Sequence, residues 1–195
     1  MNERLKKQIE FILELDKMKN LYRQTYVLHE ERKENDAEHS WHLAVMAFIL
    51  AEHSNYGIDP VKVMKMVLIH DVVEIDAGDT YCYDTEANKS KAEREEKAAH
   101  RIFGLLPVDQ YREFYGLWRE FEVSQTKEAR FAAVLDRLQP LLLNYTKNGI
   151  SWQEHGIHKE QVVARNKEYF SESDGIAELI TSILDDAEEK GWLKT

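Results

Sequence analysis

Hydrophobic residues recur at helical spacing from one end of the chain to the other, and no stretch alternates convincingly between apolar and polar positions as a strand would. Only three prolines and eight glycines interrupt the pattern. The sequence therefore predicts an all-α fold, a bundle of about seven or eight helices. With 195 residues, 43% of them hydrophobic, the chain is long enough to bury a core, and we expect a single domain over residues 1–195.

Capping residues and apolar stripes delimit these helices. We expect them from the amino terminus to about Asn20, from Asp36 through Ala51, from Asp59-Pro60 to just before Gly78, from Thr85 to Phe103, from Pro107 through Phe121, from Thr126 to Asn148-Gly149, from Lys159 to Phe170 and from Asp174 to Lys190. Asp36 can cap the second helix, and Pro140 should kink the sixth. The segment 43–51 is apolar nearly all round, so the second helix is expected to be central.

The segment 67–79 places an imidazole and several carboxylates among apolar residues. Burying ionised carboxylates loses hydration worth several kcal/mol per charge, and metal coordination is one of the few ways to recover it. On a helix, His70 and Asp71 would be neighbours and Glu74 would lie one turn on from both. A divalent metal held by His70 and Asp71, with Glu74 beside it, is therefore our first hypothesis.

Two other positions could supply ligands. His39 lies at the head of the second helix, and Asp136 lies amid apolar neighbours in the sixth. Each has another explanation, because a histidine at a helix start is often a cap or a core residue, and a mid-helix aspartate before Arg137 is often part of an ion pair. The combination with the His-Asp pair favours the metal site.

A histidine, an adjacent His-Asp pair some thirty residues later and a buried aspartate some sixty-five residues beyond it form the pattern of the HD-domain metal-dependent phosphohydrolases, which this sequence resembles. Residues 32–40 look like that family's Arg-x-Glu-Asn-x-x-Glu-His-Ser, and 70–79 like its His-Asp-x-x-Glu followed by Gly-Asp. The 5′-deoxynucleotidase-like branch fits best, because the segments 93–96, 105–107, 117–122 and 132–138 are also similar to its members. The loop 80–84 departs from that branch and looks more like bacterial HD hydrolases.

The resemblance implies a role for each matching position. It implies metal ligands at His39, His70, Asp71 and Asp136, catalytic carboxylates at Glu74 and Asp79, and a substrate-binding arginine at Arg23, with Arg32 as a further candidate. A guanidinium matches a phosphate bidentately, although both arginines could be ordinary loop residues. Two imidazoles and two carboxylates suit one divalent transition metal, Mn²⁺, Co²⁺, Fe²⁺, Ni²⁺ or Zn²⁺.

Charge and composition limit the partners. The 36 acidic and 26 basic residues give a formal charge of -10, which repels nucleic acid polymers and anionic membranes, so we expect a small-molecule phosphate substrate. One cysteine and an amino terminus without an apolar core predict a cytoplasmic protein. The apolar content of the second, fifth and final helices could bury a homodimer interface.

The leading interpretation is a phosphohydrolase acting on (deoxy)nucleoside 5′-monophosphates. A second keeps the metal and changes the substrate to another small phosphate ester or a nucleotide diphosphate. A third is a non-catalytic, metal-stabilised regulator that binds a nucleotide. Glu74 and Asp79 argue against the third, because a binding module has no need of an acid and a base beside the metal.

Overall fold

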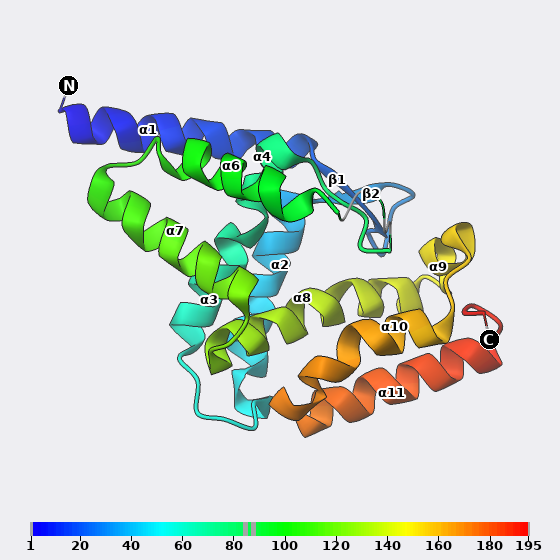
Figure 1. Ribbon diagram of the computed structural model, residues 1–195. Coiled ribbons are helices and arrows are strands. Elements are labelled where there is room, and N and C mark those ends of the chain that lie inside the picture. The colour runs from blue at the N-terminus through cyan, green and yellow to red at the C-terminus, as the bar shows by residue number, and fades with distance from the viewer. Residues whose placement is uncertain (1, 84–85, 87–88, 195) are drawn as a thin grey trace.

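The computed structural model describes residues 2–83, 86 and 89–194. Its helices are α1 (Glu3–Leu15), α2 (Asp36–Leu50), α3 (Pro60–Ile69), α4 (Glu74–Ala77), α6 (Lys91–Phe103), α7 (Val108–Val123), α8 (Lys127–Thr146), α9 (Ile150–His155), α10 (Lys159–Asn166) and α11 (Asp174–Glu189). Tighter 3₁₀ turns lie at η1 (Asp16–Asn20), η2 (Ala51–His53), η3 (His70–Val73) and η4 (Lys167–Glu172). The predicted all-α fold is confirmed (Figure 1).

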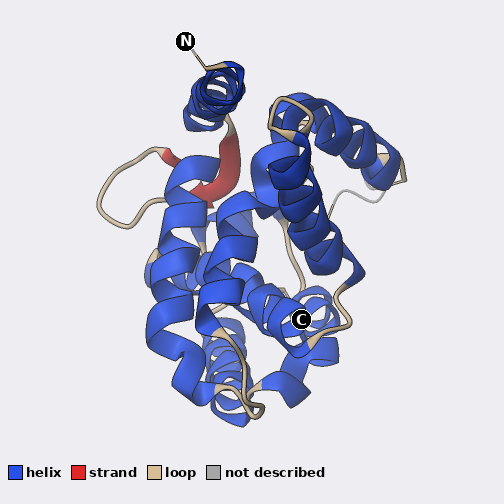
Figure 2. Ribbon diagram, turned by 90° about the vertical axis from the view of Figure 1, so that its left-hand side faces the viewer, coloured by secondary structure: helices blue, strands red, loops and turns tan. Residues whose placement is uncertain are grey.

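The sequence did not predict the antiparallel hairpin of β1 (Tyr22–Tyr26) and β2 (Lys33–Asn35). Figure 2 shows its two strands in red among the helices. The strands are short and mostly polar, and each buries one polar side chain, Thr25 in β1 and Glu34 in β2. The hydrophobic pattern therefore contains no signal for them.

Two buried clusters lie on either side of the middle of the molecule. One joins α2, α3 and α8 to the carboxyl-terminal helices, and the other joins η3 and α4 to α6 and α7. Figure 1 shows α8, α10 and α11 at one end and α1, α6 and α7 at the other, with α2 and α3 between them. No described helix has the length and apolar content needed to cross a membrane.

Several predicted boundaries change. Asn35, not Asp36, caps α2, and it forms a capping box with Glu38. The predicted third helix breaks into α3, η3 and α4 before Gly78, whose φ is 76°. The helix predicted from Thr85 begins at Lys91 in α6, and Thr85 itself lies outside the described residues. The helix α8 continues past Pro140 to Thr146, and α9 was not predicted.

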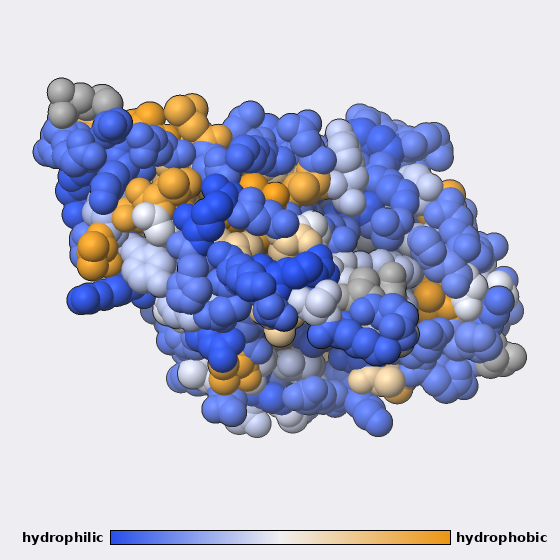
Figure 3. All heavy atoms as spheres, turned by 45° about the horizontal axis from the view of Figure 1, so that its top comes forward, coloured by the Kyte–Doolittle hydropathy of each residue, from blue (hydrophilic) through white to orange (hydrophobic). Residues whose placement is uncertain are grey.

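Large apolar side chains on α1 and α2 face the solvent. On α1, Phe11 is buried, whereas four apolar residues at helical spacing are 41–68% exposed: Leu5, Ile9, Ile12 and Leu13. The helix α2 is central on one face only, because its other face exposes Trp41, Val45, Phe48 and Ile49. Figure 3 shows hydrophobic side chains gathered near the amino-terminal end, where α1 lies.

Candidate metal centre and substrate pocket

Three elements bring the four predicted ligands together. The helix α2 carries His39, η3 carries His70 and Asp71, and α8 carries Asp136. Asp136 Oδ1 lies 3.2 Å from His39 Nε2 and 3.6 Å from His70 Nε2. Asp71 Oδ1 lies 3.1 Å from His70 Nε2. Ligand atoms of His39, His70 and Asp136 all lie within 4.8 Å of one another, so one ion could contact them together.

The 3₁₀ turn η3 determines which faces the acidic residues share. With about three residues per turn, positions i and i+3 lie directly above one another, so Glu74 lines up with Asp71. The prediction of a regular helix, with Glu74 equally close to His70, is replaced by this tighter geometry. Carboxylate oxygens of Asp71, Glu74 and Asp36 lie within 4.8 Å of one another. The site therefore has a histidine side and an acidic side.

Hydrogen bonds to both histidines direct their Nε2 atoms toward the ligand position. His70 Nδ1 lies 2.9 Å from the carbonyl oxygen of Val67 and donates to it, which leaves the buried Nε2 without a hydrogen-bond partner among the described residues. His39 Nδ1 lies 3.0 Å from Gln139 Oε1. The lone pair of such a buried imidazole nitrogen receives no hydrogen bond, and carboxylates lie beside it. This arrangement fits a divalent transition metal.

Gln139 is itself oriented by an acidic residue of the hairpin. Its Nε2 donates to Glu34 Oε1 at 2.6 Å and lies 3.2 Å from His42 Nδ1. These contacts point the amide oxygen at His39, which fixes the tautomer with the proton on Nδ1. Glu34 and Gln139 are both buried. The chain of contacts from β2 through α8 to His39 thus prepares the Nε2 lone pair for a metal.

Arg23 of β1 lies on the acidic side of the site. Its Nη1 donates to Asp71 Oδ2 at 2.6 Å and to Asp36 Oδ1 at 3.3 Å. Asp36 is fully buried, and its burial, followed by the charge of Asp71, raises its pKa to about 7. Interpreting Asp36 as a helix cap was wrong, because the side chain of Asn35 takes that role and Asp36 faces Arg23.

Burial raises the pKa of both predicted catalytic carboxyls. Glu74 is 5% exposed, and its Oε2 has no hydrogen-bond partner among the described residues. Burial, and then the charge of Asp71, raises the pKa of Glu74 well above its ordinary value. Asp79 follows Gly78, is half-buried, and has a pKa raised mainly by burial. A carboxyl whose pKa is raised by burial is better suited to donating or accepting a proton in catalysis than a fully solvated one.

The surroundings shift the pKa values of two proposed ligands, His70 and Asp136, in opposite directions. Burial alone would lower the pKa of His70, but Asp71 and Asp136 raise it well above its usual value. Burial alone would raise the pKa of Asp136, yet the neighbouring imidazoles of His39 and His70 bring it well below its usual value. The carboxylates of the site thus favour a positive charge beside them, which a metal cation bound to neutral imidazoles would supply.

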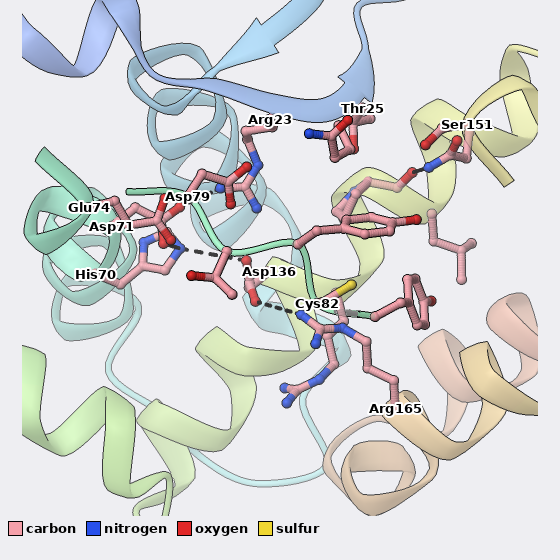
Figure 4. A pocket seen from close by; sticks show the side chains of 18 of the residues that line it. Arg23, Thr25, His70, Asp71, Glu74, Asp79, Cys82, Asp136, Ser151 and Arg165 are labelled. Carbon is pink, nitrogen blue, oxygen red and sulfur yellow. Dashed lines mark hydrogen bonds and ion pairs between the residues drawn. The ribbon is translucent and has the colours of Figure 1, made fainter. Parts of the chain in front are cut away.

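A cavity of about 180 Å³ opens onto this cluster. Figure 4 shows Arg23 and Thr25 on one side of it and Arg165 of α10 on the other, with Asp136 between them and His70, Asp71 and Glu74 at the left. Arg32 does not line this cavity. It is exposed, and its guanidinium binds Glu38 through two contacts of 2.8 Å. Substrate binding by Arg32 stays a prediction.

The sequence alone assigned no role within the site to four of its residues: Glu34, Asp36, Gln139 and Arg165. Gln139 could have been found, because it lies three residues after Asp136 on the same face of α8. Glu34 and Asp36 lie within the motif that resembles the HD family, but their roles depend on the unpredicted hairpin. Arg165 has no local signal, because only the packing of α10 brings it to the cavity.

Comparison with known proteins agrees with this geometry. Residues 15–178 match the HD domain family. The 5′-deoxynucleotidase HDDC2 of Homo sapiens is 30% identical over 135 residues, so that the match spans 69% of this chain and 65% of that protein, just under two thirds of its length. The 5′-deoxynucleotidase HDDC2 of Dictyostelium discoideum is 30% identical over 143 residues, with 70% of this chain and 75% of that protein covered.

Two solved structures share the architecture. A predicted metal-dependent phosphohydrolase from Magnetospirillum magnetotacticum MS-1 is 45% identical and superposes with a TM-score of 0.94 over 99% of this chain and 97% of that one. An HD-domain phosphohydrolase from Listeria innocua, 19% identical, superposes with a TM-score of 0.67 over 91% and 88% of the two chains and shares the fold. The resemblance noted in the sequence is confirmed, and the histidine and aspartate site supports a divalent metal.

Proposed function

Because the chain belongs to the HD-domain family, we propose that it is a metal-dependent phosphohydrolase that releases phosphate from (deoxy)nucleoside 5′-monophosphates. The observation that carries the proposal is the meeting of His39, His70 and Asp136 ligand atoms within 4.8 Å, beside two carboxyls whose pKa is raised by burial. The names of the aligned relatives suggest the substrate class.

His39, His70, Asp71 and Asp136 would hold one ion, for which Mn²⁺, Co²⁺, Fe²⁺, Ni²⁺ and Zn²⁺ are the candidates. When bound, such an ion supplies positive charge for phosphoryl oxygens and lowers the pKa of water. The donor set fits it because both Nδ1 atoms are engaged and both Nε2 atoms face Asp136.

The remaining residues bind the phosphate and move protons. Arg23 uses one nitrogen on Asp71 and keeps other guanidinium donors for phosphate oxygens. Asp79, at the loop after Gly78, would orient the attacking water and accept its proton as the new P–O bond forms. Glu74, more deeply buried, would give its proton to the 5′ oxygen as the old P–O bond breaks.

We further propose that two copies of the chain associate through the exposed apolar faces of α1 and α2. Scattered apolar residues on a surface are ordinary, but eight large ones on two helices are typical of an interaction surface. Homodimer interfaces are more apolar than the rest of a protein surface. A single domain over residues 1–195 and a cytoplasmic location stay predictions of the sequence.

The test is a phosphate-release screen of purified protein against nucleoside mono-, di- and triphosphates and simple phosphate esters, with each of the five metals. The expected result is metal-dependent release from deoxynucleoside 5′-monophosphates that His70→Ala abolishes together with bound metal. If the protein prefers a nucleotide diphosphate or a simple phosphate ester, that compound class becomes the assigned substrate. Tight nucleotide binding without hydrolysis under any metal would favour the regulator instead.

A further inference from the structure

We propose that Arg165 of α10 is a second phosphate-binding arginine, which contacts the substrate phosphate from the side of the cavity opposite Arg23. This inference rests on the proposed function and deepens it, because it adds a residue to the same site. In Figure 4, Arg165 reaches from α10 toward Asp136, whereas Arg23 approaches from β1 on the other side.

The guanidinium of Arg165 has unused donors. Among the described residues it donates no hydrogen bond, and the carboxylate oxygen nearest to it, Asp136 Oδ2, is 4.0 Å from Nη2. Arg137 also lines the cavity and is partly engaged: its Nη1 donates to the carbonyl oxygen of Ala133 at 3.1 Å, its guanidinium lies 4.0 Å from the centre of the Tyr169 ring, and its buried Nε has no hydrogen-bond partner among the described residues. Arg130 donates to Glu172 at 2.6 Å and does not line the cavity. A guanidinium carries five N–H donors, so Arg165 can bind an anion without giving up a partner.

Charge balance gives the second argument. The carboxylate that faces Arg165 is a proposed metal ligand, and ligation would share its charge with a dication. Among the described residues, Arg165 would then face a positively charged centre while the carboxylate nearest to it, that of Asp136, is already committed, which is unfavourable at short range. A phosphate between Arg165 and the centre removes that repulsion, because its oxygens can accept from the guanidinium fork.

The geometry favours the scissile phosphate over a more distant part of the substrate. The Oδ1 atom of Asp136 lies 3.2 Å from His39 Nε2, and its Oδ2 atom is the one near Arg165. Arg165 is therefore separated from the ligand cluster by a single carboxylate group. Binding by Arg23 and Arg165 from two sides would hold the phosphate more firmly than either arginine alone.

The alternative is that Arg165 only balances the charge of Asp136. Arg165→Gln and Arg165→Lys distinguish the two roles, with Arg112→Gln as the matched control, because Arg112 is exposed on α7 and does not line the cavity. Arg165 is partly exposed, so its truncation should leave the fold intact, which circular dichroism and thermal melting check.

The measurements are metal per chain by elemental analysis, the dissociation constant of inorganic phosphate for the metal-loaded protein by calorimetry, and KM for a deoxynucleoside 5′-monophosphate. For Arg165→Gln we expect unchanged metal content, with phosphate affinity and KM weakened by about 10- to 100-fold, the loss typical of a charged hydrogen-bonding pair. Arg165→Lys should fall between, because it keeps the charge and loses the fork.

Phosphate affinity of Arg165→Gln within twofold of Arg112→Gln would overturn the inference. Loss of metal in Arg165→Gln would also overturn it, because that result assigns Arg165 to holding Asp136 in place. A parent protein that hydrolyses no phosphate ester would overturn the proposed function alone, since calorimetry with inorganic phosphate reads the Arg165 contact without turnover.

Discussion

Substitutions of Glu74 and Asp79 test the catalytic step independently of metal binding. Neither is a proposed ligand, so Glu74→Gln and Asp79→Asn should retain metal and fold. Phosphate release should fall by about 10²- to 10⁴-fold in each, the range for loss of a general acid or base. The check is steady-state turnover beside elemental analysis. Parental turnover in both variants would show that these carboxyls do not transfer protons.

Gln139 is predicted to act through His39. Gln139→Leu removes the acceptor 3.0 Å from His39 Nδ1 and leaves buried Glu34 without its amide donor, so both the ring and its tautomer lose their constraint. Metal affinity should fall by about 10- to 100-fold, as for other groups that orient ligand histidines. Competition with a chelator of known affinity measures it. The control is Gln153→Leu, at an exposed position outside the cavity.

Site residues that are close together in the sequence could be predicted, and those brought together only by tertiary packing could not. His70 and Asp71 are adjacent in the chain, and His39 lies within a recognisable motif, so sequence was enough to propose them. Asp36 was misassigned as the helix cap, because the neighbouring Asn35 can also cap and does so. Asp36 is therefore the first residue inside the helix, where it is buried and pairs with Arg23. Arg165 reaches the cavity only through tertiary packing, which spacing along the chain does not encode.

At the scale of elements, the break between α3 and α4 determines where the catalytic carboxyls lie. The helix α4 that follows this break ends at Gly78, whose φ of 76° an L side chain adopts only with strain, although an added Cβ would meet no atom within 4 Å. Gly78→Ala should therefore cost about 1 kcal/mol through the backbone alone and displace Asp79. Urea denaturation measures the cost. The control Gly57→Ala also meets no atom, has no such φ, and should not destabilise the protein.

The helices were predictable where hydrophobic periodicity and caps agree. Thr126 caps α8 as expected, through its hydroxyl and the N–H of Ala129, and Asp59 with Pro60 begins α3. The hairpin escaped prediction because its strands pair polar residues. The 3₁₀ turn escaped because His70–Val73 is buried whole, so its hydrophobic pattern does not distinguish a tight turn from a regular helix.

At the scale of the whole molecule, the exposed faces of α1 and α2 predict self-association. The native chain should sediment at twice its 22.9 kDa mass, and Phe48→Glu should shift it toward the monomer, because an ionised side chain in an apolar interface loses its hydration. Phe48 is 73% exposed, so the change leaves the core intact. Leu179→Glu, on α11, is the control. If the parent protein is monomeric at micromolar concentration, the proposed dimer is wrong.

The cavity also contains the sulfur of the only cysteine in the sequence, Cys82, which lies between Tyr81 and Tyr83 in its lining. Burial raises the pKa of this thiol, so alkylation is slower than at an exposed cysteine, and it is confined to one position. A bound ligand that covers Cys82 would slow the reaction further. The mass of the intact chain, with one adduct or none, therefore reports the occupancy of the cavity without turnover or a labelled substrate.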